Sequence, residues 1–300
     1  MKLNQLKALV AIAKAGSIQE ASRLMNVTQP ALSKSIIELE RELGVPLLIR
    51  AAKGATLNSY GTMIAKRSRA IQKEVDKIYE EVDALRGDQS GRVTIGLSPP
   101  VGGAIVAEAV GTFRKQRPST LLHLLELRPS QIIDGLRDGM LDFGIVSHYG
   151  ETGPAGLKWV KLYSTASRLA IGGTRARARH TIEELGGLEW LVMDAPDDAF
   201  SFMRTLFSKL NVPLPTQVLH CSSVTLYFQL AQRLNAVSAW GEMAFTTLDE
   251  LFRRGVMSPI ELDTELPGMN IFLAYQDEDL LTPAAAACIR CLHATAAKRR

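Results

Sequence analysis

The feature that most constrains the fold of this 300-residue chain is a short polar stretch that opens a helix, NVTQPALSKSI, residues 26–36. Thr28 is suited to cap the helix with its hydroxyl, and Pro30 falls in the first turn, where a missing N–H group costs nothing. Gly44 ends the helix, and Pro46 enforces the stop. The sequence therefore fixes this helix at both ends, and we expect a tight turn immediately before it.

A second helix is predicted just upstream, where the sequence SIQE forms a capping box. The Ser17 hydroxyl is placed to accept a hydrogen bond from the Glu20 amide, and the Glu20 carboxylate to accept one from the Ser17 amide. Ala21 and Leu24 are expected to face inward. In the helix after the turn, apolar residues recur at spacings of four, three and four, which predicts a buried stripe. The stripe consists of Leu32, Ile36, Leu39 and Leu43.

Two helices joined by a tight turn, preceded by an amphipathic helix, form a helix-turn-helix. The outward face of the second helix carries Gln29, Ser33 and Lys34, and Ile37 follows one turn beyond Ser33. In this motif the first residues of the second helix meet base edges, where Gln and Lys bond to bases and Ser to bases or phosphates. The alternative that the residues leave open is a solvated polar face on a three-helix domain.

The positive charge of the chain is concentrated around this motif. Residues 1–60 hold eight Lys or Arg against four Asp or Glu, whereas residues 61–300 hold 27 of each, and the net charge is +4. A nucleic-acid-binding head requires such a bias. The short strands predicted on either side of Lys53 form a hairpin, or wing, which can place Arg50 or Lys53 beside the minor groove.

A long helix is predicted after the wing, capped by Asn58 or Ser59. Its apolar residues recur at spacings of four, three, four and three, which is the a/d seam of a coiled coil. The seam consists of Ile71, Val75, Ile78, Val82 and Leu85, with Ile64 continuing it backwards past Ser68. Because a lone helix must bury such a seam, we expect a second copy of the chain on it, in a dimer or tetramer. The alternative is packing on its own domain.

From Arg92 onward, short apolar strands alternate with amphipathic helices, which predicts parallel sheets covered by helices. Ligands of such sheets bind at the carboxyl ends of strands, beside helix N-termini. The side chains expected there suit a small organic acid, with an aromatic acid as the favoured class. They are Ser98, Pro99, Pro100, Val101, Ser147, His148, Asp194, Pro196, Ser222 and Ser223, with Met193, Phe200, Phe202 and Trp240 as apolar walls.

These positions also have a purely structural interpretation. A Ser that precedes a helix is usually only its N-cap. Asp194 is expected to pair with Arg204, to contact a ligand hydroxyl, or to cap the next helix.

The segment GSIQEASRLMNVTQPALSKSIIELERELGVPLLIR, residues 16–50, resembles the winged helix-turn-helix of the LysR-type transcriptional regulators. Its TQPALSKSI and ELGVPLL runs match the signature of that family almost position by position. The later segment LRDGMLDFGIV is similar to a recurring segment of the family's effector domain. The chain departs from the pattern at Ile37-Glu38 and Ala51-Ala52, where the family often has basic residues. We therefore expect modest phosphate neutralisation.

The resemblance implies an α/β fold class with three parts. These are a winged helix-turn-helix over residues 1–58, a dimerising linker helix over 59–90, and a two-lobed, Rossmann-like effector domain of the periplasmic-binding-protein type II over 91–300. Lobe I is expected to comprise 91–163 and 268–300, and lobe II 164–267.

The same resemblance implies a cytoplasmic regulator, an activator or a repressor, that assembles as a homotetramer or dimer. It implies double-stranded DNA with an interrupted palindrome, a small-molecule effector and RNA polymerase as partners. Ser17, Thr28 and Pro30 frame the base-reading surface and count among the candidate DNA contacts. By resemblance, Ser98, Ser147 and Ser223 match inducer-contacting positions.

The sequence offers little support for other classes of protein. Cys288 and Cys291 form a C-x-x-C within an alanine-rich helical segment, and with Cys221 they are interpreted as buried cysteines rather than a disulfide or metal site. No G-x-S-x-G, H-E-x-x-H or phosphate-loop pattern appears, so neither an enzyme nor a cofactor is expected. The apolar runs are too short to cross a membrane. Two rival functions stay open: a small-molecule binding protein whose head mediates assembly only, and an enzyme with a fused regulatory head.

Overall fold

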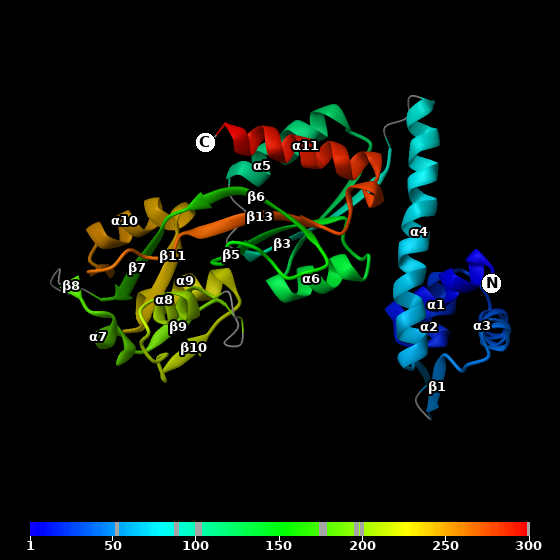
Figure 1. Cartoon of the computed structure of the whole chain (residues 1–300), viewed down its shortest axis with the longest axis horizontal. Coiled ribbons are helices and arrows are strands. Elements are labelled where there is room, and N and C mark those ends of the chain that lie inside the picture. The colour runs from blue at the N-terminus through cyan, green and yellow to red at the C-terminus, as the bar shows by residue number, and fades with distance from the viewer. Residues whose placement is uncertain are drawn as a thin grey trace.

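The computed structural model describes residues 1–51, 54–86, 90–99, 104–173, 179–194, 198 and 201–298. A helical head is followed by one long helix and then by two α/β lobes. Figure 1 shows the head against one end of the long helix and the second lobe at the far side of the molecule. Five predicted site residues lie outside the described part of the chain, namely Lys53, Pro100, Val101, Pro196 and Phe200.

The head follows the helix boundaries that the sequence predicts. Its elements are α1 (Leu3–Ala15), α2 (Ile18–Leu24), α3 (Gln29–Leu43), β1 (Leu48–Ala51) and β2 (Gly54–Leu57). The turn between α2 and α3 passes through Asn26, whose φ of 52° lies in the left-handed region that Asn tolerates better than most residues. Gly44 ends α3 with a φ of 70°. The predicted helix-turn-helix is therefore confirmed.

Two of the leucines predicted to face inward from the head are exposed instead. Leu32, Ile36 and Leu39 lie in the head core, but Leu43 is 38% exposed and Leu24 is 55% exposed. Each of these two leucines is the last residue of its helix, and there the helix has passed the edge of the core. The inward prediction was wrong at these two positions because spacing along a helix does not say where the core ends.

The long helix α4 (Ser59–Leu85) begins on the head and runs alongside the first lobe (Figure 1). Asn58 provides its cap, since the Gly61 amide donates to Asn58 Oδ1 at 2.9 Å. Ile64, which was predicted to continue the seam, instead packs against the head core, because α1 covers this part of α4. Ser68, which interrupts the apolar seam, is buried and donates from Oγ to the carbonyl of Ile64 at 2.8 Å.

The first lobe is a five-stranded sheet in the order β4-β3-β5-β13-β6. Its elements are β3 (Arg92–Leu97), α5 (Ala104–Gln116), β4 (Leu121–Glu126), α6 (Pro129–Arg137), β5 (Phe143–His148), β6 (Lys158–Thr165), β13 (Met269–Tyr275), the short η3 (Glu278–Leu280) and α11 (Pro283–Ala297). Helices α5 and α11 cover one face through a core that includes Phe113 and Leu292. Helix α6 covers the other through Ile132 and Leu136.

The second lobe is a six-stranded sheet in the order β10-β9-β11-β7-β12-β8. Its elements are β7 (Ser167–Gly172), β8 (Arg179–His180), α7 (Ile182–Gly186), β9 (Trp190–Val192), α8 (Phe202–Lys209), β10 (Val218–His220), α9 (Val224–Arg233), β11 (Val237–Gly241), η2 (Glu242–Ala244), α10 (Phe245–Arg253) and β12 (Met257–Leu262). Trp190 and Phe207 are fully buried in one of its two cores, and Tyr227 and Trp240 are buried in the other.

Both sheets are mixed, whereas the sequence predicts parallel ones. β3 runs parallel to β4 and β5, but β13 runs antiparallel to β5 and β6. In the second lobe, β9 is parallel to β10 and β11, while β7 is antiparallel to β11 and β12. The antiparallel strands belong to the two crossings between lobes: β6 continues through Ala166 into β7, and β12 leads back into β13. These crossings bring the carboxyl ends of both sheets to a shared edge.

Candidate DNA-binding face and effector cavity

The outward face of α3 is presented by a helix that is fixed at its start. The Ala31 amide donates to Thr28 Oγ1 at 3.4 Å, and Pro30 occupies the first turn. Gln29 and Lys34 are exposed and Ser33 is partly exposed. Among the described residues, none accepts from, donates to or forms an ion pair with these three side chains. They are therefore available to a partner outside the chain.

Ser17 and Ile37, at the margin of this face, behave differently from one another. The Glu20 amide donates to Ser17 Oγ at 3.1 Å, but the Glu20 carboxylate accepts from Arg23 Nη1 at 3.0 Å instead of returning to the Ser17 amide. Ser17 thus has a structural task as the N-cap of α2. Ile37 is partly exposed and is not among the residues that form the head core.

The wing is present as an antiparallel hairpin. β1 pairs with β2 in a register that joins Leu48 to Leu57 and Ala51 to Gly54. The backbone of Arg50 lies in β1, whereas its side chain, like the whole of Lys53, is outside the described part of the chain. Their contacts with DNA stay predictions.

The seam of α4 is largely uncovered in the single chain. Four of its members are 40–90% exposed, namely Ile71, Ile78, Val82 and Leu85, and Val75 is half-buried. Four residues of α4 make hydrogen bonds or ion pairs with lobe I, namely Lys66, Lys73, Lys77 and Glu80. They lie two positions along from seam residues, which on an α-helix is about 200° away and hence on the opposite face. The seam is therefore free for a second copy.

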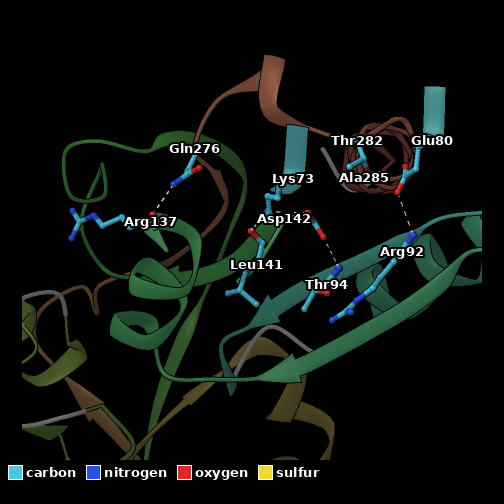
Figure 2. Close-up of polar contacts among 10 residues, drawn as sticks. All are labelled: Lys73, Glu80, Arg92, Thr94, Arg137, Leu141, Asp142, Gln276, Thr282 and Ala285. Carbon is cyan, nitrogen blue, oxygen red and sulfur yellow. Dashed lines mark hydrogen bonds and ion pairs between the residues drawn. The ribbon is translucent and has the colours of Figure 1, made fainter. Parts of the chain in front are cut away.

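The face of α4 opposite the seam is tied to lobe I by a partly buried ion pair (Figure 2). Lys73 Nζ lies 3.0 Å from Asp142 Oδ1 and donates to the carbonyl of Leu141 at 2.7 Å. The second oxygen of Asp142 accepts from the Thr94 amide at 2.7 Å. Lys66 and Asp138 form a second, more exposed pair at 3.1 Å. A shift of lobe I is therefore coupled to α4 through specific contacts.

Glu80 makes a second tie between α4 and lobe I, farther along the helix. Its carboxylate accepts from the Arg92 amide and from the Ala284 amide, each at 3.4 Å, as α11 begins. The start of α11 is capped by Thr282, which accepts from the Ala285 amide at 3.2 Å (Figure 2). Burial raises the pKa of Glu80 above its ordinary value. On the far side of this junction, Gln276 Nε2 donates to the carbonyl of Arg137 at 2.9 Å.

A cavity of about 520 Å³ lies between the two lobes, a size typical of small-molecule sites. Lobe I contributes Pro99, Tyr149, Tyr163, Thr165 and Ile271 among others, and lobe II contributes residues from β9, α8, α9, β11, η2 and α10. Four of the residues predicted for an effector site line this cavity: Pro99, Asp194, Phe202 and Trp240. The predicted wall residue Met193 lines it as well.

Asp194 caps a helix at the wall of the cavity. Its Oδ2 accepts from the Phe202 amide at 3.0 Å, at the start of α8, which is one of the three tasks expected for it. Arg204 is not among the groups that shift the Asp194 pKa, so the pairing with it gains no support. Burial raises the pKa of Asp194 to about 6, and the nearby Asp198 carboxylate adds to that rise while His220 opposes it. The carboxylate therefore holds its charge at a cost.

Thr165 and Glu242 join the two lobes at this cavity. Thr165 ends β6, and its Oγ1 donates to Glu242 Oε2 of η2 at 2.9 Å. Glu242 is exposed and lines the cavity together with Asp194. The pair therefore combines a contact between lobes with a second carboxylate beside the ligand space.

The predicted serines and His148 have tasks within the fold. Ser98 is buried, lies 2.9 Å from the hydroxyl of Ser147, and accepts from the Ser147 amide at 2.8 Å. His148 is stacked on Phe272 with ring centroids 4.5 Å apart, and burial lowers its pKa. Ser223 caps α9 by accepting from the Leu226 amide at 3.3 Å, and its neighbour Ser222 is exposed. None of these five is among the described residues that line the cavity.

Several lining residues were missed by the sequence analysis. They include Tyr149, Tyr163, Thr165, Tyr227, Phe228 and Glu242. Tyr227 is placed by three backbone bonds, since its hydroxyl lies 3.2 Å from the Leu191 carbonyl, 3.0 Å from the Ala239 carbonyl and 3.1 Å from the Ala239 amide. Thr165 carried a weak signal, because it ends β6 where the chain crosses to the second lobe, and Glu242 follows the carboxyl end of β11.

The three cysteines are buried thiols. Burial raises the pKa of the Cys288 thiol to about 12, and also that of Cys291, so neither is a ready nucleophile. No three His, Cys, Asp or Glu side chains within the described ranges are arranged to hold a metal ion. Nor does any helix in those ranges combine the length and apolarity needed to cross a bilayer.

Two family models match the chain. The model of the LysR substrate binding domain matches residues 86–297, and the model of the bacterial regulatory helix-turn-helix protein of the lysR family matches residues 3–62. A relative from Bacillus subtilis, the uncharacterized HTH-type transcriptional regulator YybE, is 27% identical over 71% of this chain and 73% of its own length.

Solved structures share the fold. A full-length OxyR variant from Pseudomonas aeruginosa matches 99% of this chain and 94% of its own, with a TM-score of 0.73 and 20% identity. Full-length CbnR in complex with its target DNA matches 98% of this chain and 100% of its own, with a TM-score of 0.63 and 19% identity. With the effector-domain model spanning more than half of the sequence, the chain belongs to the LysR family, as a DNA-binding transcriptional regulator with an effector-binding domain and not an enzyme.

Proposed function

We propose that two copies of this chain bind an interrupted palindrome through paired heads, and that a ligand between the lobes alters promoter activity by changing the head spacing. The observation that carries the proposal is the face of α3. Gln29, Ser33 and Lys34 have no partner among the described residues, and they lie on a helix fixed at both ends. In a paired reader, the spacing of half-sites mirrors the spacing of the heads.

The response to a ligand requires that one arrangement of the subunits binds it better than another. The cavity is suited to this, because Thr165 of one lobe and Glu242 of the other meet at its wall. A change in the angle between lobes would reach α4 through Lys73 and Asp142. Contact with RNA polymerase stays a prediction from the resemblance.

Assembly beyond a dimer requires a second self-association surface in addition to the α4 seam. The edge strand β4 offers one, since Leu121, Leu124 and Leu125 are 41–56% exposed. Exposed apolar side chains on an unpaired sheet edge favour association. Light scattering after chromatography should then give a tetramer for the chain and a dimer for Leu125→Lys.

The effector was predicted from the sequence to be an organic acid, and preferably an aromatic one. Aromatic lining by Tyr149, Phe228 and Trp240 supports the aromatic half of that prediction. The prediction that the effector is an acid lacks support, because the described lining includes no Lys or Arg that would pair with its carboxylate.

The test of DNA reading is a gel-shift assay of the full chain on the promoter region beside its own gene. Gln29→Ala should lose roughly 1–3 kcal/mol of discrimination at one base pair of each half-site. Asn4→Ala, which removes an exposed amide on α1, serves as the control and should leave the preference intact. Unchanged affinity and preference in Gln29→Ala would favour the rival function, in which the head mediates assembly only.

A further inference from the structure

The interlobe cavity has an unusual balance of charge for a site expected to hold an acid. Asp194 and Glu242 both line it, and none of the described lining residues is Lys, Arg or His. The carboxylate of Asp198 also acts on Asp194 and adds to the rise of its pKa. The charged side chains of the described wall are therefore all negative, while the starts of α8 and α9 at Phe202 and Val224 add backbone N–H groups to it.

These two carboxylates are not neutralised within the described chain. Asp194 accepts from the Phe202 amide, and Glu242 accepts from Thr165, but neither forms an ion pair with a described cation. The described basic group that acts on Asp194 is His220, whose Nε2 lies 3.2 Å from the carbonyl of Met193. Arg168 of β7 pairs with Asp249 at 2.8 Å and lies 4.0 Å from the ring centre of Phe245. A carboxylate beside a partly apolar cavity is costly unless a cation approaches it. The raised pKa of Asp194 is a sign of that cost.

The remaining wall is aromatic and is held rigid by ring contacts. Trp240 meets Tyr227 and Phe228 edge to face, with centroids 5.1 Å and 4.7 Å apart. Tyr149 meets Phe202 in the same way at 5.2 Å. The faces of such rings carry negative potential and attract ammonium groups, most strongly where water is excluded. Rings and carboxylates therefore favour the same kind of ligand.

We propose that the effector of this chain is an organic cation, an amine with an aromatic or branched apolar body, whose ammonium group lies in the field of Asp194 and Glu242. The inference rests on the proposed function, since it assumes that the interlobe cavity is the effector site. An organic acid of the same shape would lose its hydration and meet two carboxylates. A neutral ligand would gain the apolar contacts alone.

The experiment uses three probes that share one body: 3,3-diphenylpropylamine, 3,3-diphenyl-1-propanol and 3,3-diphenylpropanoate. Binding to the full chain is measured by calorimetry at neutral pH, and gel-shift assays follow operator affinity with each probe. The amine should bind about tenfold more tightly than the alcohol, and the acid more weakly than the alcohol. The amine alone should then change operator affinity at low concentration.

Two variants locate the charge that is responsible. Asp194→Asn and Glu242→Gln retain an oxygen acceptor for the Phe202 amide and for Thr165, and each should reduce the preference for the amine severalfold. Glu183→Gln removes an exposed carboxylate from α7 of the same lobe, outside the cavity, and should leave the preference unchanged. Thermal unfolding of each variant establishes that it is folded.

Equal binding of the three probes, stronger binding of the acid, or no binding of the amine would overturn the inference. The same result would follow if the preference for the amine survived in both cavity variants. None of these outcomes affects the proposed function, provided that the unaltered chain binds its operator with a sequence preference and that Gln29→Ala loses this preference. If the unaltered chain showed no sequence preference for its operator, the proposed function itself would be wrong.

Discussion

Within the described part of the chain, the outward side chains of α3 have no bonding partner, whereas the carboxylates at the wall of the interlobe cavity each accept a hydrogen bond. Gln29, Ser33 and Lys34 come from six consecutive residues of a single helix. The cavity is assembled from both lobes, and its polar residues Asp194 and Glu242 also hold a helix start and a contact between lobes. The face of α3 is an exposed surface on one helix, whereas the polar groups of the cavity also take part in holding the lobes together.

This difference separates recognition from response. Substitutions on α3 should change which DNA is bound while leaving the fold unaffected, because nothing inside the chain depends on those side chains. Substitutions in the cavity should change stability and response together, because the same groups serve both. The linker helix joins the two regions, with the seam on one face and the contacts to lobe I on the other.

The largest effect is expected at the seam, because a modest reading head depends on being paired. Ile78→Glu places a charge in an apolar seam whose residue 78 is 58% exposed in the single chain. Operator affinity should fall by about 100-fold or more, as two heads held together lose their mutual effective concentration. Sedimentation should report a smaller assembly than that of the unaltered chain, with at most the β4 contact left to join two copies.

Glu81→Gln provides the control for this seam variant, since it alters charge on α4 at an exposed position outside the seam. If Ile78→Glu keeps both the assembly size and the operator affinity of the unaltered chain, the seam packs on something other than a second copy. That result would favour the alternative, in which the apolar seam of α4 packs on its own domain.

The next largest effect is expected at the junction of α4 with lobe I. Asp142→Ala leaves the Thr94 amide without its acceptor and Lys73 without its charge partner, at a pair whose side chains are only 13% and 21% exposed. The free energy of unfolding of the effector domain should fall by about 2 kcal/mol. Urea denaturation of the full chain measures this change.

The matched control is Asp138→Ala, which breaks the pair with Lys66 on the same junction, where both side chains are 39–44% exposed. A more exposed pair contributes about 0–1 kcal/mol. Equal losses in the two variants would mean that burial does not distinguish the two contacts.

The sequence allowed the α3 face to be predicted because every determinant is local. Thr28, Pro30 and Gly44 fix the helix, and the spacing of Leu32, Ile36 and Leu39 fixes the buried side. Once the capping and buried residues of α3 are identified, the remaining side chains are those that face outward. The same reasoning failed for Leu24 and Leu43, since the extent of a core depends on where other helices end.

The cavity was only partly predictable, because the order and direction of the strands in the two mixed sheets decide which strand ends meet, and the sequence does not state that order. The rule that ligands bind at the carboxyl ends of parallel strands found Pro99, Asp194 and Trp240. The rule did not predict Tyr149 or Thr165, whose positions at the cavity depend on the crossing from β6 to β7. Nor does a sequence reveal that two hydroxyls bond to each other, as those of Ser98 and Ser147 do.

A smaller effect, and one that depends on pH, is expected at Asp194. Burial raises its pKa from 3.8 to about 6, so between these values the folded chain binds more protons than the unfolded chain. Stability is therefore lost as pH rises through this window. Asp194→Asn removes that loss, and should gain on the order of 1–2 kcal/mol at about pH 7.5 and nothing near pH 4.

The charged groups that face Asp194 are Asp198 and His220, and the phenols of Tyr149 and Tyr227 lie within its field. Thermal unfolding at the two pH values, with Glu183→Gln alongside, separates a local charge effect from a change in net charge. A gain that is the same at both pH values would show that packing, and not the ionised carboxyl, limits stability at this position.

The smallest effect is expected at Lys34, and it tests whether the α3 face reads mainly bases or mainly phosphates. Lys34 is exposed and has no ion pair among the described residues, so any charge contact that it makes is with DNA. If it neutralises one phosphate, Lys34→Ala should reduce the slope of log affinity against log salt by about 0.9 per subunit, with similar losses on every sequence. If the slope is unchanged while one base preference is lost, Lys34 instead bonds to a base. Such a result would extend the base-reading face from Gln29 across the first two turns of α3.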